Sequence, residues 1–187
     1  MTFSFDMERK PFSKYNVHEM DDLFLSRLLS NASANGVDAS FRRDLAIHGQ
    51  HPNAVILCCS DSRVSPEVIF NVGLGELFVI RTAGNTLGEN EYRSIEYAYH
   101  HLGVKRLIVM AHTHCGAIGA ALSDPSDENP LICCIHQHIK DERDPDEASK
   151  LNALKVKEEV LQRLPDLSVY VLLYDIEDGS LNTIEKE

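Results

Sequence analysis

The stretch AVILCCSDSRV, residues 54–64, places a continuous apolar run directly before a polar loop. Short apolar runs with β-branched residues are typical of buried parallel strands, so we predict a strand over Ala54–Cys58. Three later runs have the same character, at Leu77–Ile80, Leu107–Ala111 and Ser168–Tyr174. The repeated pattern favours a sheet of buried, parallel strands.

Helical patterns separate these strands. Apolar residues recur at helical spacing in Asn90–Leu102, and Pro66–Val72 and Ala148–Leu164 are also predicted as helices. Alternation of strands and helices indicates an α/β fold class, a single domain with a mainly parallel central sheet flanked by helices. A Gly-Ser turn at 179–180 then leads into Leu181–Ile184, which we predict as a short antiparallel edge strand near the C-terminus.

The N-terminal region is predicted to be a helical arm, since apolar residues recur at near-helical spacing in His18–Ala32. We expect one domain over residues 1–187, consisting of the N-terminal helical arm at 1–45 and an α/β core at 46–187. Residues 123–150 interrupt the pattern with eight acids and three basic residues. We interpret them as a solvated excursion around a short helix.

The composition excludes several classes of protein. The chain has 187 residues, 43% of them apolar, and a formal net charge of −11. Such a charge repels phosphate backbones and anionic lipids, so we expect a small-molecule substrate, no nucleic acid and no membrane partner. The apolar runs are far shorter than the roughly 18 residues of a membrane-spanning helix. The N-terminus lacks the pattern of a secretory signal, which favours a cytoplasmic location.

The cysteines point to metal or catalytic chemistry, because an odd number in adjacent pairs does not suit a disulfide scaffold. They are Cys58, Cys59, Cys115, Cys133 and Cys134. Cys134 and His138 have a spacing that can hold a metal ion, but there is no second half-site. We therefore expect a helix there with buried thiols and exposed imidazoles.

Two polar loops follow predicted strands. Cys59 comes after the first strand, and His112 and Cys115 come after the third. Because the carboxyl ends of parallel strands share one edge of a sheet, these side chains should meet there. Two thiolates and one imidazole make three zinc ligands, the number typical of a catalytic site that leaves one position for water.

Asp61 has two possible roles. If its carboxylate binds the zinc, the site is closed. If Arg63 instead holds the carboxylate in a bidentate pair, the fourth position is open to water and Asp61 can accept a hydrogen bond from hydroxide.

These segments resemble the β-class carbonic anhydrases over most of the chain. The motifs that carry the resemblance are GQHP at 49–52, CSDSRV at 59–64, PE at 66–67, GLGELFVIRTAGN at 73–85, SIEYAYHHLGV at 94–104, HTHCGA at 112–117 and YD at 174–175. A single H-x-x-C pair would be weak evidence. The motifs together, in this order, are highly specific.

The resemblance implies a zinc ion on Cys59, His112 and Cys115, a catalytic pair of Asp61 and Arg63, and reversible hydration of carbon dioxide to bicarbonate and a proton by hydroxide on zinc. It also implies a homo-oligomer, either a dimer or a dimer of dimers, with the substrate pocket at the dimer interface. The residues that match the substrate-binding positions of the plant-like branch are Gln50, Phe78 and Tyr97.

Two other functions stay open at this point. Relatives with the same zinc ligands hydrolyse carbonyl sulfide or carbon disulfide, and this chain could use the same nucleophile on those substrates. A non-catalytic zinc-binding protein, closed permanently by Asp61, is the other reading. The intact Arg63 argues against it.

Overall fold

The computed structural model describes residues 17–33 and 36–184. The chain divides into two units, one ending at Ile47 and the other beginning at His48. Helices α1 (Val17–Ser33) and α2 (Ala39–His48) come first, α2 ending at the first residue of the second unit. The other elements are β1 (Ala54–Cys59), α3 (Pro66–Ile69), β2 (Leu77–Thr82), the 3₁₀ turn η2 (Ala83–Asn85), α4 (Glu89–His101), β3 (Arg106–His112), α5 (Gly116–Ser123), α6 (Pro130–Ile139), α7 (Pro145–Arg163), β4 (Ser168–Tyr174) and β5 (Leu181–Thr183).

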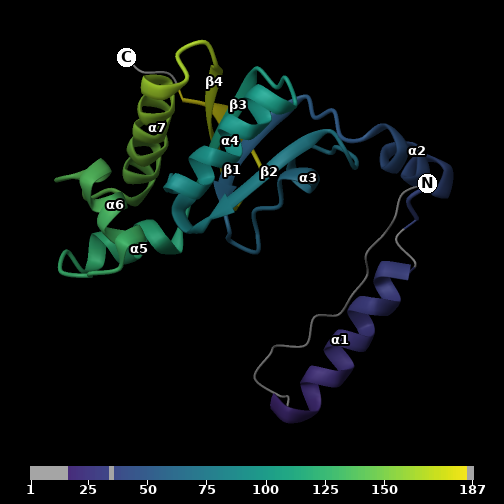
Figure 1. Ribbon diagram of the computed structural model, residues 1–187. Helices are drawn as coiled ribbons and strands as arrows, with labels where there is room; N and C mark the ends of the chain where they lie inside the picture. The colour runs from purple at the N-terminus through teal and green to yellow at the C-terminus, as the bar shows by residue number, and fades with distance from the viewer. Residues whose placement is uncertain (1–16, 34–35, 185–187) are drawn as a thin grey trace. The chain divides into compact units, whose positions relative to one another are not determined.

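The second unit is built on a five-stranded sheet with the order β2-β1-β3-β4-β5 (Figure 1). Strands β1, β2, β3 and β4 pair in parallel, and β5 pairs antiparallel with β4 at the edge. This confirms the predicted α/β class, the mainly parallel sheet and the antiparallel edge strand. The parallel pairing brings the ends of β1 and β3 to the same edge.

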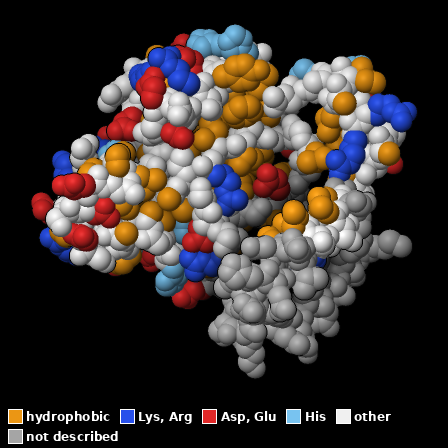
Figure 2. Space-filling view, turned by 60° about the horizontal axis from the view of Figure 1, so that its bottom comes forward, with side chains coloured by type: hydrophobic (Ala, Val, Ile, Leu, Met, Phe, Trp, Pro, Cys, Tyr) orange, Lys and Arg blue, Asp and Glu red, His pale blue; other side chains and the backbone are white. Residues whose placement is uncertain are grey.

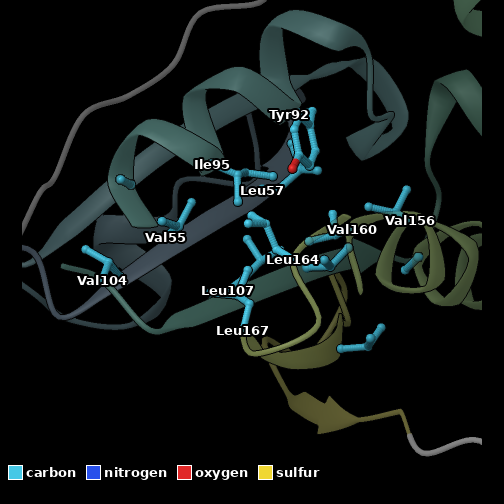
Figure 3. Close-up of a cluster of buried hydrophobic side chains, with 14 of the residues drawn as sticks. Val55, Leu57, Tyr92, Ile95, Val104, Leu107, Val156, Val160, Leu164 and Leu167 are labelled. Atoms are coloured by element: carbon cyan, nitrogen blue, oxygen red, sulfur yellow. The ribbon is translucent and has the colours of Figure 1, made fainter. Parts of the chain in front are cut away.

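Helices α4 and α7 cover one face of this sheet. Tyr92 and Ile95 from α4, with Val156 and Val160 from α7, pack on strand residues such as Leu57 (Figure 3). Burying one such side chain stabilises the fold by about 1.5–3 kcal/mol. This core fixes the strands from which the polar loops extend.

The opposite face of the sheet carries a separate cluster. Ile56, Cys58 and Met110 are buried there, with Ile69 of α3 packed against them. Side chains alternate along a strand, so Cys58 points away from its neighbour Cys59. Burial raises the pKa of the Cys58 thiol to about 12, so this sulfur remains protonated.

The structure contains helices that the sequence analysis did not predict. Helix α5, rich in small residues, and helix α2 were not predicted. The helix expected within 123–150 is present as α6, and the region also holds the first turns of α7. Asp144 begins α7 by accepting hydrogen bonds from the backbone N–H groups of Asp146 and Glu147 at 3.0 and 2.9 Å, a capping signal that could have been read from the sequence.

The described helices contain no segment long and apolar enough to cross a membrane. Figure 2 shows acidic and basic side chains interspersed among hydrophobic ones on one face of the molecule.

Candidate metal centre

Three buried side chains meet at the carboxyl edge of the sheet. Cys59 ends β1, His112 ends β3, and Cys115 stands directly before α5. One ligand atom from each lies within 4.8 Å of the others, the only such group of three or more metal-binding side chains in the described residues. The sequence-predicted ligands are therefore brought together.

The His112 ring is prepared to offer a lone pair. Its Nδ1 donates a hydrogen bond to the Thr113 carbonyl at 2.8 Å, so the proton sits on Nδ1. Its Nε2 is buried and has no hydrogen-bond partner among the described residues. A buried nitrogen acceptor with no partner is costly, and a metal ion bound at Nε2 would satisfy it while Nδ1 donates to a carbonyl, as is typical of metal-binding histidines. The donor set fits zinc.

The two sulfurs lie 4.0 Å apart, and the Cys59 sulfur accepts a hydrogen bond from the Gly84 N–H at 3.2 Å. The hydrogen bond from Cys115 lowers the pKa of Cys59, and the Gly84 N–H acts in the same direction. The pKa of Cys115 is raised, because it shares a proton with Cys59 and is buried. The two sulfurs are therefore placed so that one of them can lose its proton while the other keeps it.

Asp61 and Arg63 form a bidentate pair beside the cluster. The Arg63 Nε donates to Asp61 Oδ1 at 2.9 Å and Nη2 donates to Oδ2 at 2.7 Å, while the Arg63 backbone N–H also donates to Oδ1 at 2.9 Å. These hydrogen bonds hold the pKa of Asp61 well below its usual range. Both carboxylate oxygens are thus engaged by Arg63.

Arg81 of β2 fixes the loop that carries this pair. Its guanidinium donates to the backbone carbonyls of Cys59, Asp61 and Val64 at 3.1, 2.7 and 2.7 Å. Sequence reasoning missed this residue. The sequence signal that could have found it is a basic residue directly after the end of a predicted strand.

Two of the three residues predicted to bind substrate are neighbours. Phe78 and Tyr97 are neighbours, with ring centroids 6.3 Å apart. Tyr97 also stacks on His101 at 5.0 Å and is 46% exposed. Gln50 is exposed in the segment before β1.

Known proteins share this fold. The chain superimposes on the β-carbonic anhydrase CcaA with a TM-score of 0.69 and 28% identity, covering 87% of this chain and 95% of that one. It superimposes on tetrameric β-carbonic anhydrases of Sordaria macrospora with a TM-score of 0.72 and 27% identity, covering 89% and 98%. The family model described as carbonic anhydrase matches residues 54–181. The chain belongs to the β-carbonic anhydrase family.

Curated members of the family align with parts of the chain. A carbonic anhydrase of Synechococcus elongatus is 32% identical over 168 residues, covering 74% of this chain and 62% of the relative. Carbonic anhydrase 2 of Mycobacterium tuberculosis is 49% identical over 79 residues, covering 42% of this chain and 38% of the relative. The chain spans less than two thirds of the length of these two relatives.

Two expectations about the neighbourhood of this β-carbonic anhydrase site are wrong. The thiols of α6 were expected to be buried, but Cys133 and Cys134 are only partly buried. The imidazoles of α6 were expected to be exposed, but His138 is 7% exposed. It is buried because α7 packs on α6 and offers two polar partners, Asn152 and Glu159. The sequence contained no local sign of this contact, since α7 follows α6 through a separate loop.

Proposed function

We propose that the protein is a zinc-dependent carbonic anhydrase (carbonate dehydratase), which hydrates carbon dioxide reversibly to bicarbonate and a proton. The observation that carries this proposal is the buried cluster of two thiols and one imidazole whose Nε2 has no partner among the described residues. The family membership of the chain supports the same reaction. Five free cysteines, all described, suit a reducing compartment, so we propose a cytoplasmic location.

Cys59, His112 and Cys115 would hold the zinc ion through one nitrogen and two sulfur atoms. When bound, zinc lowers the pKa of a coordinated water and so supplies a nucleophile near neutral pH. The two thiolates place more negative charge at the site than imidazoles would. We therefore expect activity to rise towards alkaline pH.

Asp61 would act as the hydrogen-bond acceptor that orients the nucleophile, and Arg63 would hold it in that role. The bidentate geometry supports these two roles, because a carboxylate held at both oxygens is not free to move onto the metal. Of the two roles that the sequence left open for Asp61, we therefore propose the pairing with Arg63 and an open fourth position.

Phe78 and Tyr97 would line the substrate pocket of a second copy. In the sheet register Cys59 is opposite Thr82 and Phe78 is opposite Val55. Phe78 therefore lies four residues, or roughly 13 Å, from the level of Cys59 along the strands. Residues so far from Cys59 along the strands can line the pocket at a metal centre if that metal centre belongs to the other subunit of a dimer. Gln50 would complete the pocket.

We predict that the protein is at least a homodimer, with a dimer of dimers as the larger alternative. Sedimentation equilibrium should give a mass that is a multiple of 21.0 kDa. Tyr97→Arg would place a charge on this exposed aromatic surface, so we expect it to shift the mass towards the monomer and to lower the hydration rate in parallel. A catalytically competent monomer of the parent protein would end this proposal.

Stopped-flow hydration of carbon dioxide, on protein with measured zinc content, tests the proposed reaction. We expect hydration that follows the zinc content and rises with pH. Hydrolysis of carbonyl sulfide or carbon disulfide without hydration would establish the alternative substrate class. One zinc per chain with no activity on any of these substrates at any pH would instead identify a non-catalytic zinc-binding protein.

A further inference from the structure

A buried polar chain runs from helix α6 to the metal centre. The Nδ1 of His138 donates to the Asn152 side-chain oxygen at 2.9 Å, and the Asn152 side-chain N–H donates to the Gly84 carbonyl at 2.8 Å. Asn152 is fully buried. Gly84 in turn donates its own N–H to the sulfur of Cys59. Hydrogen bonds thus connect α6, α7, the turn η2 and the end of β1.

The His138 ring is doubly protonated. Because the Asn152 N–H group faces the Gly84 carbonyl, its oxygen must face His138, so Nδ1 is a donor. The other ring nitrogen, Nε2, lies 3.0 Å from the Glu159 carboxylate, which can only accept. Burial lowers the pKa of His138, but hydrogen bonds with Cys134, Glu159 and Asn152 outweigh it and raise the pKa to about 10. The Asn152 oxygen therefore accepts a charge-assisted hydrogen bond.

Gly84 stands at the other end of this series of hydrogen bonds, and its backbone has little conformational freedom. Its φ is +66°, in the region that favours glycine. A Cβ at this position would lie 2.8 Å from Cδ1 of Ile135 on α6. The glycine is therefore packed against α6, held by its carbonyl, and turned so that its N–H points to the sulfur.

We propose that His138 and Asn152 are positioning residues that fix the Gly84 N–H against the Cys59 sulfur and so set how strongly that thiolate donates to the metal. An N–H that points at a thiolate withdraws charge from it, and partners of metal ligands orient the ligands and tune the metal. The proposal rests on the proposed zinc site but not on the identity of the substrate. A purely structural role, in which the pair only joins α6 to α7, would change stability and leave Cys59 unaffected.

Cobalt substitution separates these two roles, because the sulfur-to-cobalt charge-transfer band reports thiolate donor strength without any enzymatic turnover. Asn152→Leu removes both hydrogen bonds at similar side-chain volume. We expect the band to move to lower energy, since the sulfur loses a fixed donor. Chelator competition should show the zinc dissociation constant rising on the order of 10-fold, the lower end for partners of metal ligands, because the Cys59 sulfur is no longer held in its orientation.

His138→Gln is the conservative variant, because a glutamine N–H can still donate to Asn152, and we expect a smaller shift of the same sign. His136→Gln is the matched control on the same helix. His136 contacts the Asp124 carbonyl at 3.1 Å and should leave the band and the affinity at parental values.

The proposal is overturned if folded Asn152→Leu keeps the parental band and the parental zinc affinity. If Asn152→Leu does not fold, His138→Gln decides by the same two readings. A parent protein that binds cobalt but does not hydrate carbon dioxide refutes the proposed reaction and leaves this test valid. A parent that takes up no cobalt refutes the metal site, and this proposal with it.

Discussion

Cys59→Ser should abolish zinc binding at one equivalent per chain, with loss of the proposed hydration activity. A serine hydroxyl does not replace a thiolate as a zinc ligand, and the two remaining ligands, His112 and Cys115, fall short of the three that a catalytic site needs. Elemental analysis of the purified variant checks this expectation.

Cys58→Ser is the matched control, because the two cysteines are adjacent and face opposite sides of the sheet. This variant should keep its zinc. Its free energy of unfolding should fall by about 1–3 kcal/mol, since a hydroxyl replaces a fully buried thiol. Full zinc in Cys59→Ser, or loss of zinc in folded Cys58→Ser, would assign the site to other residues.

The strands and the ligand trio could be predicted because both depend on local patterns. A short apolar run with β-branched residues, such as Ala54–Cys58, indicates a buried strand. A parallel sheet then brings the residues after β1 and β3 to one edge, so Cys59, His112 and Cys115 meet without further information.

The helices that were not predicted lack such a pattern. Helix α5 reads GAIGAALS, whose glycines and alanines give no apolar stripe at helical spacing. Helix α2 has no buried residues, so no periodic core face could show in its sequence. Its cap was readable, since the Asp38 carboxylate accepts hydrogen bonds from the N–H groups of Ser40 and Phe41 at 2.9 and 3.0 Å.

The surroundings of the metal ligands could not be predicted for a different reason. The positive φ of Gly84 suits a turn, but its N–H reaches Cys59 only because β2 pairs with β1. The contact of His138 with Asn152 exists only once α6 and α7 are packed together. Such contacts follow from tertiary packing, which no local spacing encodes.

Arg63→Ala should reduce turnover on the order of 10²-fold, as loss of a preorganised group in an active site does, while zinc content stays near parental. The variant leaves the Asp61 carboxylate with one backbone N–H and no guanidinium. An unpaired carboxylate beside a divalent cation should then move onto it and occupy the open position. Loss of Arg63 would also raise the pKa of Asp61 towards its usual range, weakening it as an acceptor.

A second substitution distinguishes displacement by Asp61 from simple loss of a positive charge. Asp61→Ala leaves the site open but the nucleophile unoriented, so its residual activity should exceed that of Arg63→Ala. The double variant should match Asp61→Ala, because no carboxylate remains to occupy the metal. Arg93→Ala is the control, since Arg93 forms surface ion pairs with Glu89 and Glu96 on α4 and takes no part in the Asp61 loop. If zinc-loaded Arg63→Ala hydrates carbon dioxide at a near-parental rate, or the double variant is no faster than Arg63→Ala, the Asp61–Arg63 pair does not control access to the metal and only stabilises its loop.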